Sequence, residues 1–330
     1  MKLNSSYILF LLVLVSSLVL ISGSTSWLGI WVGLEMNFLS FLPLLTSSEN
    51  FSKSSSSLKY FMVQSLGTIL LLISIILILW SSPKTMELQN LSLTMSLLLK
   101  LGSSPFHLWT PSIMENLSWF SCFIMLTMQK LGPLIALSNL MKMKLMIWII
   151  LMNLMVGTLG SLNQNSLRKL MGYSSITHTG WILTGMIEGI NCWMFYFIIY
   201  SILNLTLILT FYFMNVSFIN QWTSIFMKPS QKLWMISCFL SMSGFPPMIG
   251  FYPKWLILEN TMITNSHLIT SILILSSLIS LFIYLRISFS LLLIYSSSMK
   301  MNMWKSYPMN NLISIGWVQV ILMIVLPVMM

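Results

Sequence analysis

Long apolar runs, bounded by Ser, Asn, Pro and Lys, follow one another along almost the whole chain. Each run holds about 20 residues, which is the length an α-helix needs to cross a bilayer. A membrane β-barrel would instead alternate apolar and polar residues. We therefore expect an all-α polytopic membrane protein with about eleven transmembrane helices. The expected segments are 5–22, 27–45, 58–80, 88–112, 118–140, 144–162, 166–187, 192–214, 233–265, 268–293 and 311–329.

The connections between these segments are short and rich in Ser and Asn, and none has the length or composition of an interdomain linker. We therefore expect residues 1–330 to form a single transmembrane domain. Lys2 and the apolar stretch after it also resemble a secretory signal. Because further hydrophobic segments follow without interruption, we interpret this stretch as the first membrane helix.

The composition excludes a water-soluble protein. Apolar residues make up 57% of the chain and charged residues 7%, whereas soluble proteins carry about a quarter charged residues. The formal net charge is +10, but the basic residues lie singly or in pairs and form no basic stripe, which argues against nucleic-acid binding. The three cysteines, Cys122, Cys192 and Cys238, lie in separate segments and predict neither a disulfide framework nor a CxxC metal site.

The basic residues of the loops divide unequally between the two sides of the membrane. The more basic side, which also holds the N-terminus, has Lys2, Lys53, Arg168, Lys169, Lys228, Lys232, Lys300 and Lys305. The other side has Lys84, Lys142 and Lys144. The positive-inside rule then places the N-terminus inside and, with an odd number of helices, the C-terminus outside.

Three lysines lie where a charge is costly. Lys100, Lys130 and Lys254 fall deep within apolar segments, and a lysine at the centre of a membrane helix costs about 2.5–3.5 kcal/mol. We expect them to face the interior of the bundle. There, burial disfavours the charged form and a nearby carboxylate favours it, which suits a lysine to reversible proton exchange. The alternative is that long side chains reach the membrane surface.

The other charged residues of the segments differ in depth. Glu35 lies well inside segment 27–45, so its carboxylate requires a basic partner. Lys59, Glu259 and Arg286 lie nearer segment ends, where extension to the membrane surface is an equally good interpretation.

Glycine and proline clusters predict that two segments are broken. Segment 88–112 contains the sequence KLGSSPFHLWTP, and segment 233–265 contains SGFPPMIGFYPKW. We expect the breaks at about 102–105 and 244–248, where freed carbonyls require protein, water or a cation. A kinked helix packed on its neighbours is the alternative. The breaks lie five segments apart, which predicts inverted five-helix repeats over about 5–140 and 144–293, followed by a C-terminal helix over about 311–329.

Two histidines, His107 and His178, lie within segments and are candidates for proton relay. A buried, hydrogen-bonded structural histidine is the alternative interpretation. A membrane haem would need facing histidine ligands, and no paired spacing occurs along one helix. The chain also has no GxGxxG motif, no P-loop and no Ser-His-Asp order. We therefore expect neither a metal nor a bound cofactor.

Several of these stretches together resemble a known family. They are SWLGIWVGLEMNFLSFLPLL, LKYFMVQ, LLLKLGSSPFHLWTPSIMENLSW, MQKLGPL, GSLNQNSLRKLMGYSSITHTGW and GFPPMIGFYPKW. The chain is similar over nearly its whole length to the chain 2 family of mitochondrial NADH-ubiquinone oxidoreductase, respiratory complex I, in its animal form. The resemblance implies an antiporter-like subunit of the proton-pumping membrane arm.

The resemblance also implies roles for the charged residues. Glu35 would be the family's glutamate of the second segment, with Lys59 as its partner. Lys100, Lys130 and Lys254 would be the lysines of the central hydrophilic axis, and His107 and His178 match motif positions as well. Departures from the family pattern are mild and fall at Leu101, Ser103 and Ser104.

The function implied is that of a core subunit that translocates protons across the mitochondrial inner membrane. NADH oxidation and ubiquinone reduction would occur in other subunits, which would hold the FMN, the Fe–S clusters and the quinone site. The partners implied are the other membrane-arm subunits and a bilayer containing cardiolipin, with no nucleic acid. The N-terminus would lie in the matrix and the C-terminus in the intermembrane space. Two other functions stay open, a stand-alone cation/proton antiporter and a structural membrane subunit that conducts nothing.

Overall fold

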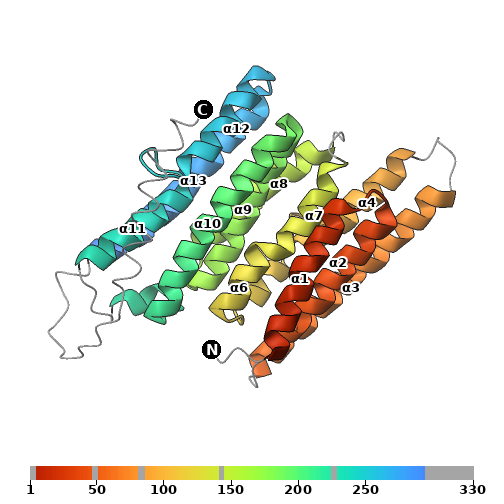
Figure 1. Ribbon diagram of the computed structural model, residues 1–330. Helices are drawn as coiled ribbons and strands as arrows, with labels where there is room; N and C mark the ends of the chain where they lie inside the picture. The colour runs from red at the N-terminus through yellow and green to blue at the C-terminus, as the bar shows by residue number, and fades with distance from the viewer. Residues whose placement is uncertain (1–4, 47–50, 81–85, 141–144, 224–228, 294–330) are drawn as a thin grey trace. The chain divides into compact units, whose positions relative to one another are not determined.

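The computed structural model describes residues 5–46, 51–80, 86–140, 145–223 and 229–293, and this part of the chain is helical almost throughout. Its single β contact is an isolated antiparallel bridge between Ser166 and Phe218. The all-α prediction is therefore confirmed, and segment 311–329 lies outside the described residues. The first helices are α1 (Ser5–Gly23), α2 (Trp27–Thr46), α3 (Phe51–Trp80), α4 (Met86–Leu101), α5 (Trp109–Met114), α6 (Trp119–Leu126) and α7 (Met128–Ser138) (Figure 1). The others are α8 (Leu145–Leu162), α9 (Leu167–Glu188), α10 (Ile190–Met214), the short 3-10 helix η2 (Ile219–Thr223), α11 (Pro229–Ser243), α12 (Phe251–Ile263) and α13 (His267–Leu293).

The chain divides into two compact units, Met1–Ile149 and Ile150–Met330. In the first, α1, α2 and α3 pack side by side and precede the broken segment α4/α5 (Figure 1). In the second, α8, α9 and α10 precede the broken segment α11/α12, and α13 packs against both of its pieces. The single domain over 1–330 and the repeat boundaries 5–140 and 144–293 stay predictions.

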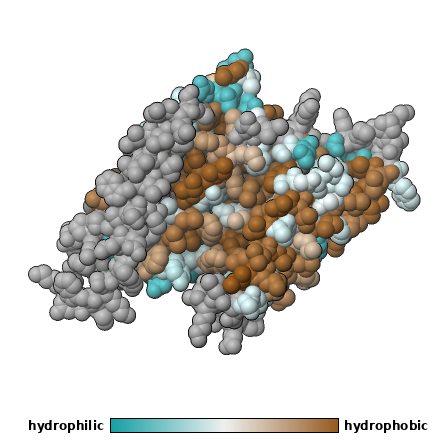
Figure 2. Space-filling view, viewed as in Figure 1, coloured by the Kyte–Doolittle hydropathy of each residue, from teal (hydrophilic) through white to brown (hydrophobic). Residues whose placement is uncertain are grey.

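Length and composition qualify seven stretches of the described residues as membrane spans. Three predicted segments of this described part are not among them. Segments 88–112 and 233–265 are each divided into shorter helices, and segment 166–187 forms the undivided helix α9, which is long enough to span but less apolar. The candidate spans carry many exposed apolar side chains, such as Leu12, Leu66 and Leu79 in the first unit. Figure 2 shows hydrophobic side chains over much of the visible face of the helices of this unit, as expected of helices that contact lipid.

The first break lies where the glycine and proline pattern predicts it. Helix α4 ends at Leu101, and Gly102 follows with a φ of +66°, a conformation that glycine adopts without strain. The Ser103 N–H donates to the Leu98 carbonyl at 3.2 Å, which is the long hydrogen bond of a Schellman cap. A Cβ at Gly102 would collide with Thr110, so this position needs glycine for space as well as for φ.

The second break has the same cap. Helix α11 ends at Ser243, and Gly244 follows with a φ of +79°. The Phe245 N–H donates to the Leu240 carbonyl at 3.1 Å, again across a Schellman cap. Helix α12 begins only at Phe251, and Figure 1 shows α11 and α12 as separate helices. Both predicted breaks are therefore confirmed.

A further interruption was not predicted. The predicted segment 118–140 is one crossing by length, yet α6 ends at Leu126 and α7 begins at Met128. The Thr127 hydroxyl between them donates to the Phe123 carbonyl at 2.7 Å, and such side-chain bonds compete with the regular helical ladder. Pro133 inside α7 also lacks an N–H to donate.

Candidate functional site

The three deep lysines are buried, as predicted. The exposed fraction is 5% for Lys100, 6% for Lys130 and 5% for Lys254. Extension of these side chains to the surface of their units is thereby excluded. Lys59 differs, because it lies on α3 with an exposed side chain.

Lys100 occupies the last turn of α4, immediately before the first break. Its aliphatic stem runs close to Gly67 of α3, where an added Cβ would lie 2.9 Å from the Lys100 Cγ. The Gln64 amide, also on α3, donates to the Lys100 carbonyl at 3.2 Å. In the described part of the chain, the Lys100 ammonium nitrogen has no hydrogen-bond partner. The lysine is therefore held by its stem and its backbone, while the nitrogen is left available.

Glu35 on α2 supplies the negative charge that acts on Lys100. One oxygen of this half-buried carboxylate is enclosed without a hydrogen-bond partner in the described residues. The resemblance implied Lys59 as the partner, but Glu35 and Lys59, both described, form no ion pair. The physical reason is that Lys59 lies on an exposed face of α3, whereas Lys100 is buried at the end of α4. Lys100 is therefore a candidate for the base that interacts with the deep carboxylate, and the pairing of Glu35 with Lys59 stays a prediction.

Lys130 lies on α7 beside a buried chain of polar side chains. The Tyr60 hydroxyl donates to Gln129 Oε1 at 2.8 Å, and Gln129 Nε2 donates to Asn37 Oδ1 at 2.8 Å. The chain connects α3, α7 and α2 through side chains that are almost fully buried at Tyr60 and Asn37. These hydrogen bonds hold Gln129, and with it the turn of α7 that carries Lys130. At the other end of the chain, Asn37 follows Glu35 by two residues on α2.

In the second unit, Lys254 borders a small polar cavity with His178. Hydroxyl groups from α8, α9 and α13 line the same cavity, namely those of Ser161, Ser174, Thr177, Ser276, Ser280 and Tyr284. Most of these hydroxyls donate to carbonyls of their own helices, for example Ser174 to Met171 at 2.9 Å and Ser276 to Leu273 at 2.8 Å. Their oxygens can still accept a hydrogen bond, so the imidazole and the amine share one partly polar lining.

Two groups contact the Lys254 ammonium directly. Its Nζ donates to the Ser243 carbonyl at 2.7 Å, and it lies 5.6 Å from the centre of the Trp181 ring. Ser243 is the last residue of α11, so its carbonyl belongs to the negative end of that helix dipole. The lysine of α12 thus reaches back across the break to the end of α11.

The two candidate histidines have different surroundings. His178 is buried, and its Nδ1 lies 2.8 Å from the Tyr196 hydroxyl, while its ring centre lies 4.9 Å from that of Tyr200. His107 is half-buried in the connection between α4 and α5, and its Nδ1 lies 3.2 Å from the nearby Pro105 carbonyl. The structure therefore places His178 with a buried lysine, whereas the hydrogen bond of His107 is local.

The same arrangement of helices occurs in solved structures. The fold matches a chain of respiratory complex I from Thermus thermophilus with a TM-score of 0.83 at 19% identity, covering 97% of this chain and 78% of that one. It also matches a chain of the Mrp complex from Dietzia sp. DQ12-45-1b with a TM-score of 0.77 at 15% identity, covering 84% and 59%. At these identities the likeness establishes the fold.

Sequence relatives establish the family. Residues 24–280 match the profile of the family described as NADH:quinone oxidoreductase/Mrp antiporter, TM. The chain is 38% identical over 318 residues to NADH-ubiquinone oxidoreductase chain 2 of Locusta migratoria, covering 94% of this chain and 92% of the relative. The chain belongs to the NADH-ubiquinone oxidoreductase chain 2 family. The Bos taurus member is 30% identical over 318 residues, covering 92% of this chain and 90% of its own.

The sequence analysis did not identify every residue of the site in this chain 2 family member. Asn37 and Gln129 could have been identified, because an amide deep in an apolar segment requires hydrogen-bond partners. Trp181 could not, since tryptophan is common in membrane helices without any role in a site. The Ser243 carbonyl is invisible to a search by side chain. The structure adds these groups to the predicted set.

The sequence predicts neither a metal nor a bound cofactor for this family member. In the described ranges, no group of three or more His, Cys, Asp or Glu side chains is arranged to hold a metal ion. The absence of a bound cofactor stays a prediction.

Proposed function

We propose that this chain is a core membrane-arm subunit of respiratory complex I that translocates protons across the mitochondrial inner membrane. NADH oxidation and ubiquinone reduction take place in other subunits. Membership of the chain 2 family, and relatives named as subunits of NADH-ubiquinone oxidoreductase, support the proposal. The single observation that carries it is the burial of three lysines, two of them at helix breaks. Such charges are costly in a membrane, so their presence is best explained by a function.

In the first unit, the proposed proton transfer involves the Lys100 amine and the Glu35 carboxylate. The charge of Glu35 acts on the Lys100 amine, so a change of charge at either group is felt by the other. Lys130, whose neighbour Gln129 is hydrogen-bonded to both α2 and α3, is the next buried amine in this unit.

In the second unit, Lys254 holds its proton against the Ser243 carbonyl and can release it to the polar cavity. His178 borders this cavity and is the group that can accept the proton through the intervening hydroxyls or water. Tyr196, hydrogen-bonded to the imidazole, orients the ring for this transfer.

The proposal also covers the orientation of the chain in the membrane and its partners. The excess of basic residues in the loops on the N-terminal side supports an N-terminus in the matrix and a C-terminus in the intermembrane space. The partners are the other membrane-arm subunits and the bilayer, including cardiolipin. The chain holds no redox centre of its own, and NADH, FMN, the Fe–S clusters and ubiquinone belong to other subunits.

The test uses membranes that contain the intact complex with Lys100→Met, Lys130→Met or Lys254→Met. Methionine keeps a long unbranched side chain and removes the proton-carrying group. NADH oxidation and formation of the proton gradient are measured separately, and Lys59→Met serves as a matched control for loss of one exposed lysine. We expect fewer protons moved per NADH oxidised in the three buried variants, with the subunit still assembled. Normal pumping in all three would overturn the proposal.

A stand-alone cation/proton antiporter is the second candidate function. The likeness of the fold to a chain of the Mrp complex favours it. The two functions differ in autonomy, so the discriminating observation is whether the chain is stable alone after solubilisation. Recovery of a folded, isolated chain that exchanges cations for protons would favour the antiporter. Recovery only within a large assembly would favour the complex I subunit.

A further inference from the structure

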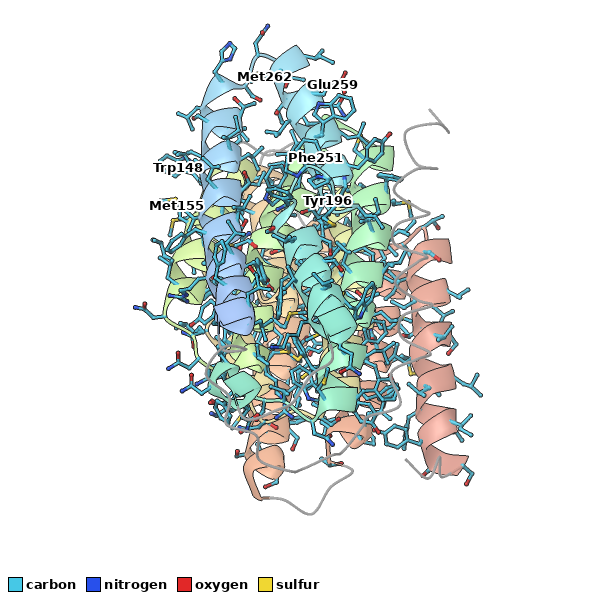
Figure 3. All side chains as sticks on the ribbon, turned by 90° about the vertical axis from the view of Figure 1, so that its left-hand side faces the viewer. Trp148, Met155, Tyr196, Phe251, Glu259 and Met262 are labelled. Carbon is cyan, nitrogen blue, oxygen red and sulfur yellow. The ribbon has the colours of Figure 1, made fainter. Side chains whose placement is uncertain are left out.

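Among the described residues of the second unit, no carboxylate lies beside the buried ammonium of Lys254. Residues 150–330 contain only two acidic residues, Glu188 and Glu259. Glu188 accepts a hydrogen bond from Thr264, which follows Lys254 by ten positions along α12, about 15 Å at the rise of an α-helix. Glu259 is exposed and lies toward the far end of α12, whereas Tyr196 lies deeper in the bundle (Figure 3). Any stabilisation of the charged form of this lysine within the described part of the second unit therefore comes from groups other than a carboxylate.

The groups that face Lys254 from the surrounding helices are neutral or only weakly basic. Helix α9 contributes His178, and α13 contributes Tyr284, both on the cavity. Helix α10 contributes Tyr196 and Tyr200 behind the imidazole. The described part of α11 contributes the Ser243 carbonyl. None of these groups carries a negative charge at neutral pH.

Trp181 is placed to take the role of the missing carboxylate. The Lys254 nitrogen lies 5.6 Å from the centre of its ring, within the range of a cation–π interaction, and tryptophan is the most favourable aromatic partner. The indole is 2% exposed and stacks on Tyr196 with ring centres 6.4 Å apart and planes 8° apart. Burial away from water makes such a contact stronger than it is at a surface.

Gly244 leaves the room that this arrangement needs. A Cβ at this position would lie 2.9 Å from Lys254 Cδ and 3.1 Å from its nitrogen. The side chain of Lys254 therefore passes directly over the glycine to reach both the Ser243 carbonyl and the indole face. The break in the helix thus serves to bring the ammonium onto Trp181.

We infer that the indole face of Trp181 stabilises the protonated form of Lys254 in place of a carboxylate, which makes Trp181 a positioning residue for proton transfer in the second unit. The inference rests on the proposed function, because it assigns Trp181 to the proton transfer proposed above. It adds a residue whose role is electrostatic rather than proton-carrying, since an indole does not exchange protons in this pH range.

The test compares Trp181→Leu with Trp193→Leu in membranes that contain the intact complex. Trp193 is also 2% exposed, and it lies on α10 outside the Lys254 cavity, so it controls for loss of a buried indole. Protons moved per NADH oxidised are recorded over a range of pH. Without the indole face, Lys254 loses its proton more readily as the pH rises. We expect the alkaline limit of pumping to move to lower pH by on the order of one unit in Trp181→Leu and to stay in place in Trp193→Leu.

An unchanged alkaline limit in Trp181→Leu, or an equal shift in Trp193→Leu, would overturn the inference. If Trp181→Leu does not assemble, Trp181→Phe decides, because phenylalanine keeps a weaker aromatic face. A smaller shift in the same direction then supports the inference, and no shift overturns it. Lys254→Met separates the two proposals. If that variant pumps normally, the proposed function fails at this lysine; if it does not pump while Trp181→Leu is unchanged, only the role of Trp181 fails.

Discussion

Removal of the charge of Glu35 should reveal which lysine is its partner. We expect this partner to be Lys100, on which the charge of Glu35 acts, whereas the family resemblance implied Lys59. The two assignments differ in a double-mutant cycle, because only interacting residues give non-additive effects. The variants are Glu35→Gln, Lys100→Met and Lys59→Met, together with the two double variants that include Glu35→Gln.

The size of the coupling follows from the placement of the charges. Two unit charges 4 Å apart attract each other by about 4 kcal/mol at an effective dielectric constant of about 20, and by about half as much at twice that distance. Glu35 and Lys100 form no direct ion pair but still interact, so we expect a coupling of about 1–3 kcal/mol. Because Lys59 is exposed, its coupling to Glu35 should be below about 0.5 kcal/mol.

The measurement is the heat resistance of the assembled complex in detergent, followed by the fraction of the subunit retained in it. Glu35→Gln and Lys100→Met should each lower this resistance, because each leaves a buried charge without compensation. The double variant should recover part of the loss. Lys59→Met should cause little loss alone and add to that of Glu35→Gln. Non-additivity with Lys59 as large as that with Lys100 would refute the assignment.

Three further predictions concern packing and hydrogen bonds. Gly67→Ala should displace the stem of Lys100 and reduce protons moved per NADH oxidised severalfold in the assembled complex, whereas Gly23→Ala, with open space at its Cβ, should not. Gln129→Leu removes two partly buried hydrogen bonds and should lower the stability of the complex to heat by the equivalent of about 1–3 kcal/mol. Gly250→Ala should prevent assembly on immunoblots of native gels, because its Cβ would collide with the backbone of α11.

Much of the fold could be predicted because a membrane imposes simple rules. Apolar runs of the right length predicted the helices, and glycine followed within a few residues by proline predicted both breaks. The interruption at Thr127 has no such signal, since one threonine in an apolar segment is ordinary. Whether its hydroxyl bonds to the preceding turn depends on local packing, which the sequence does not show.

The sequence predicted which charged residues are buried better than it predicted which of them interact. Insertion cost alone indicated that Lys100 is buried. The partner of Glu35 depends on how α2, α3 and α4 are rotated about their axes, and a rotation of one residue moves a side chain by about 100°. The apolar stripe that fixes rotation in soluble helices is weak in helices that are apolar all round. The sequence alone therefore does not show which lysine faces Glu35.

The two helix breaks solve one electrostatic problem in two ways. In both, a glycine of positive φ ends the first half-helix, and a buried lysine stands next to the break in sequence. Lys100 stands on the half-helix that ends, and its charge is balanced by Glu35. Lys254 stands on the half-helix that begins and reaches back to a carbonyl and to an indole face. A carboxylate can gain or lose a proton and so switch the affinity of its lysine, whereas an indole cannot. Under the proposed function, we therefore expect the lysine of the first unit to depend on a neighbouring carboxylate, and that of the second on an indole face that carries no titratable proton.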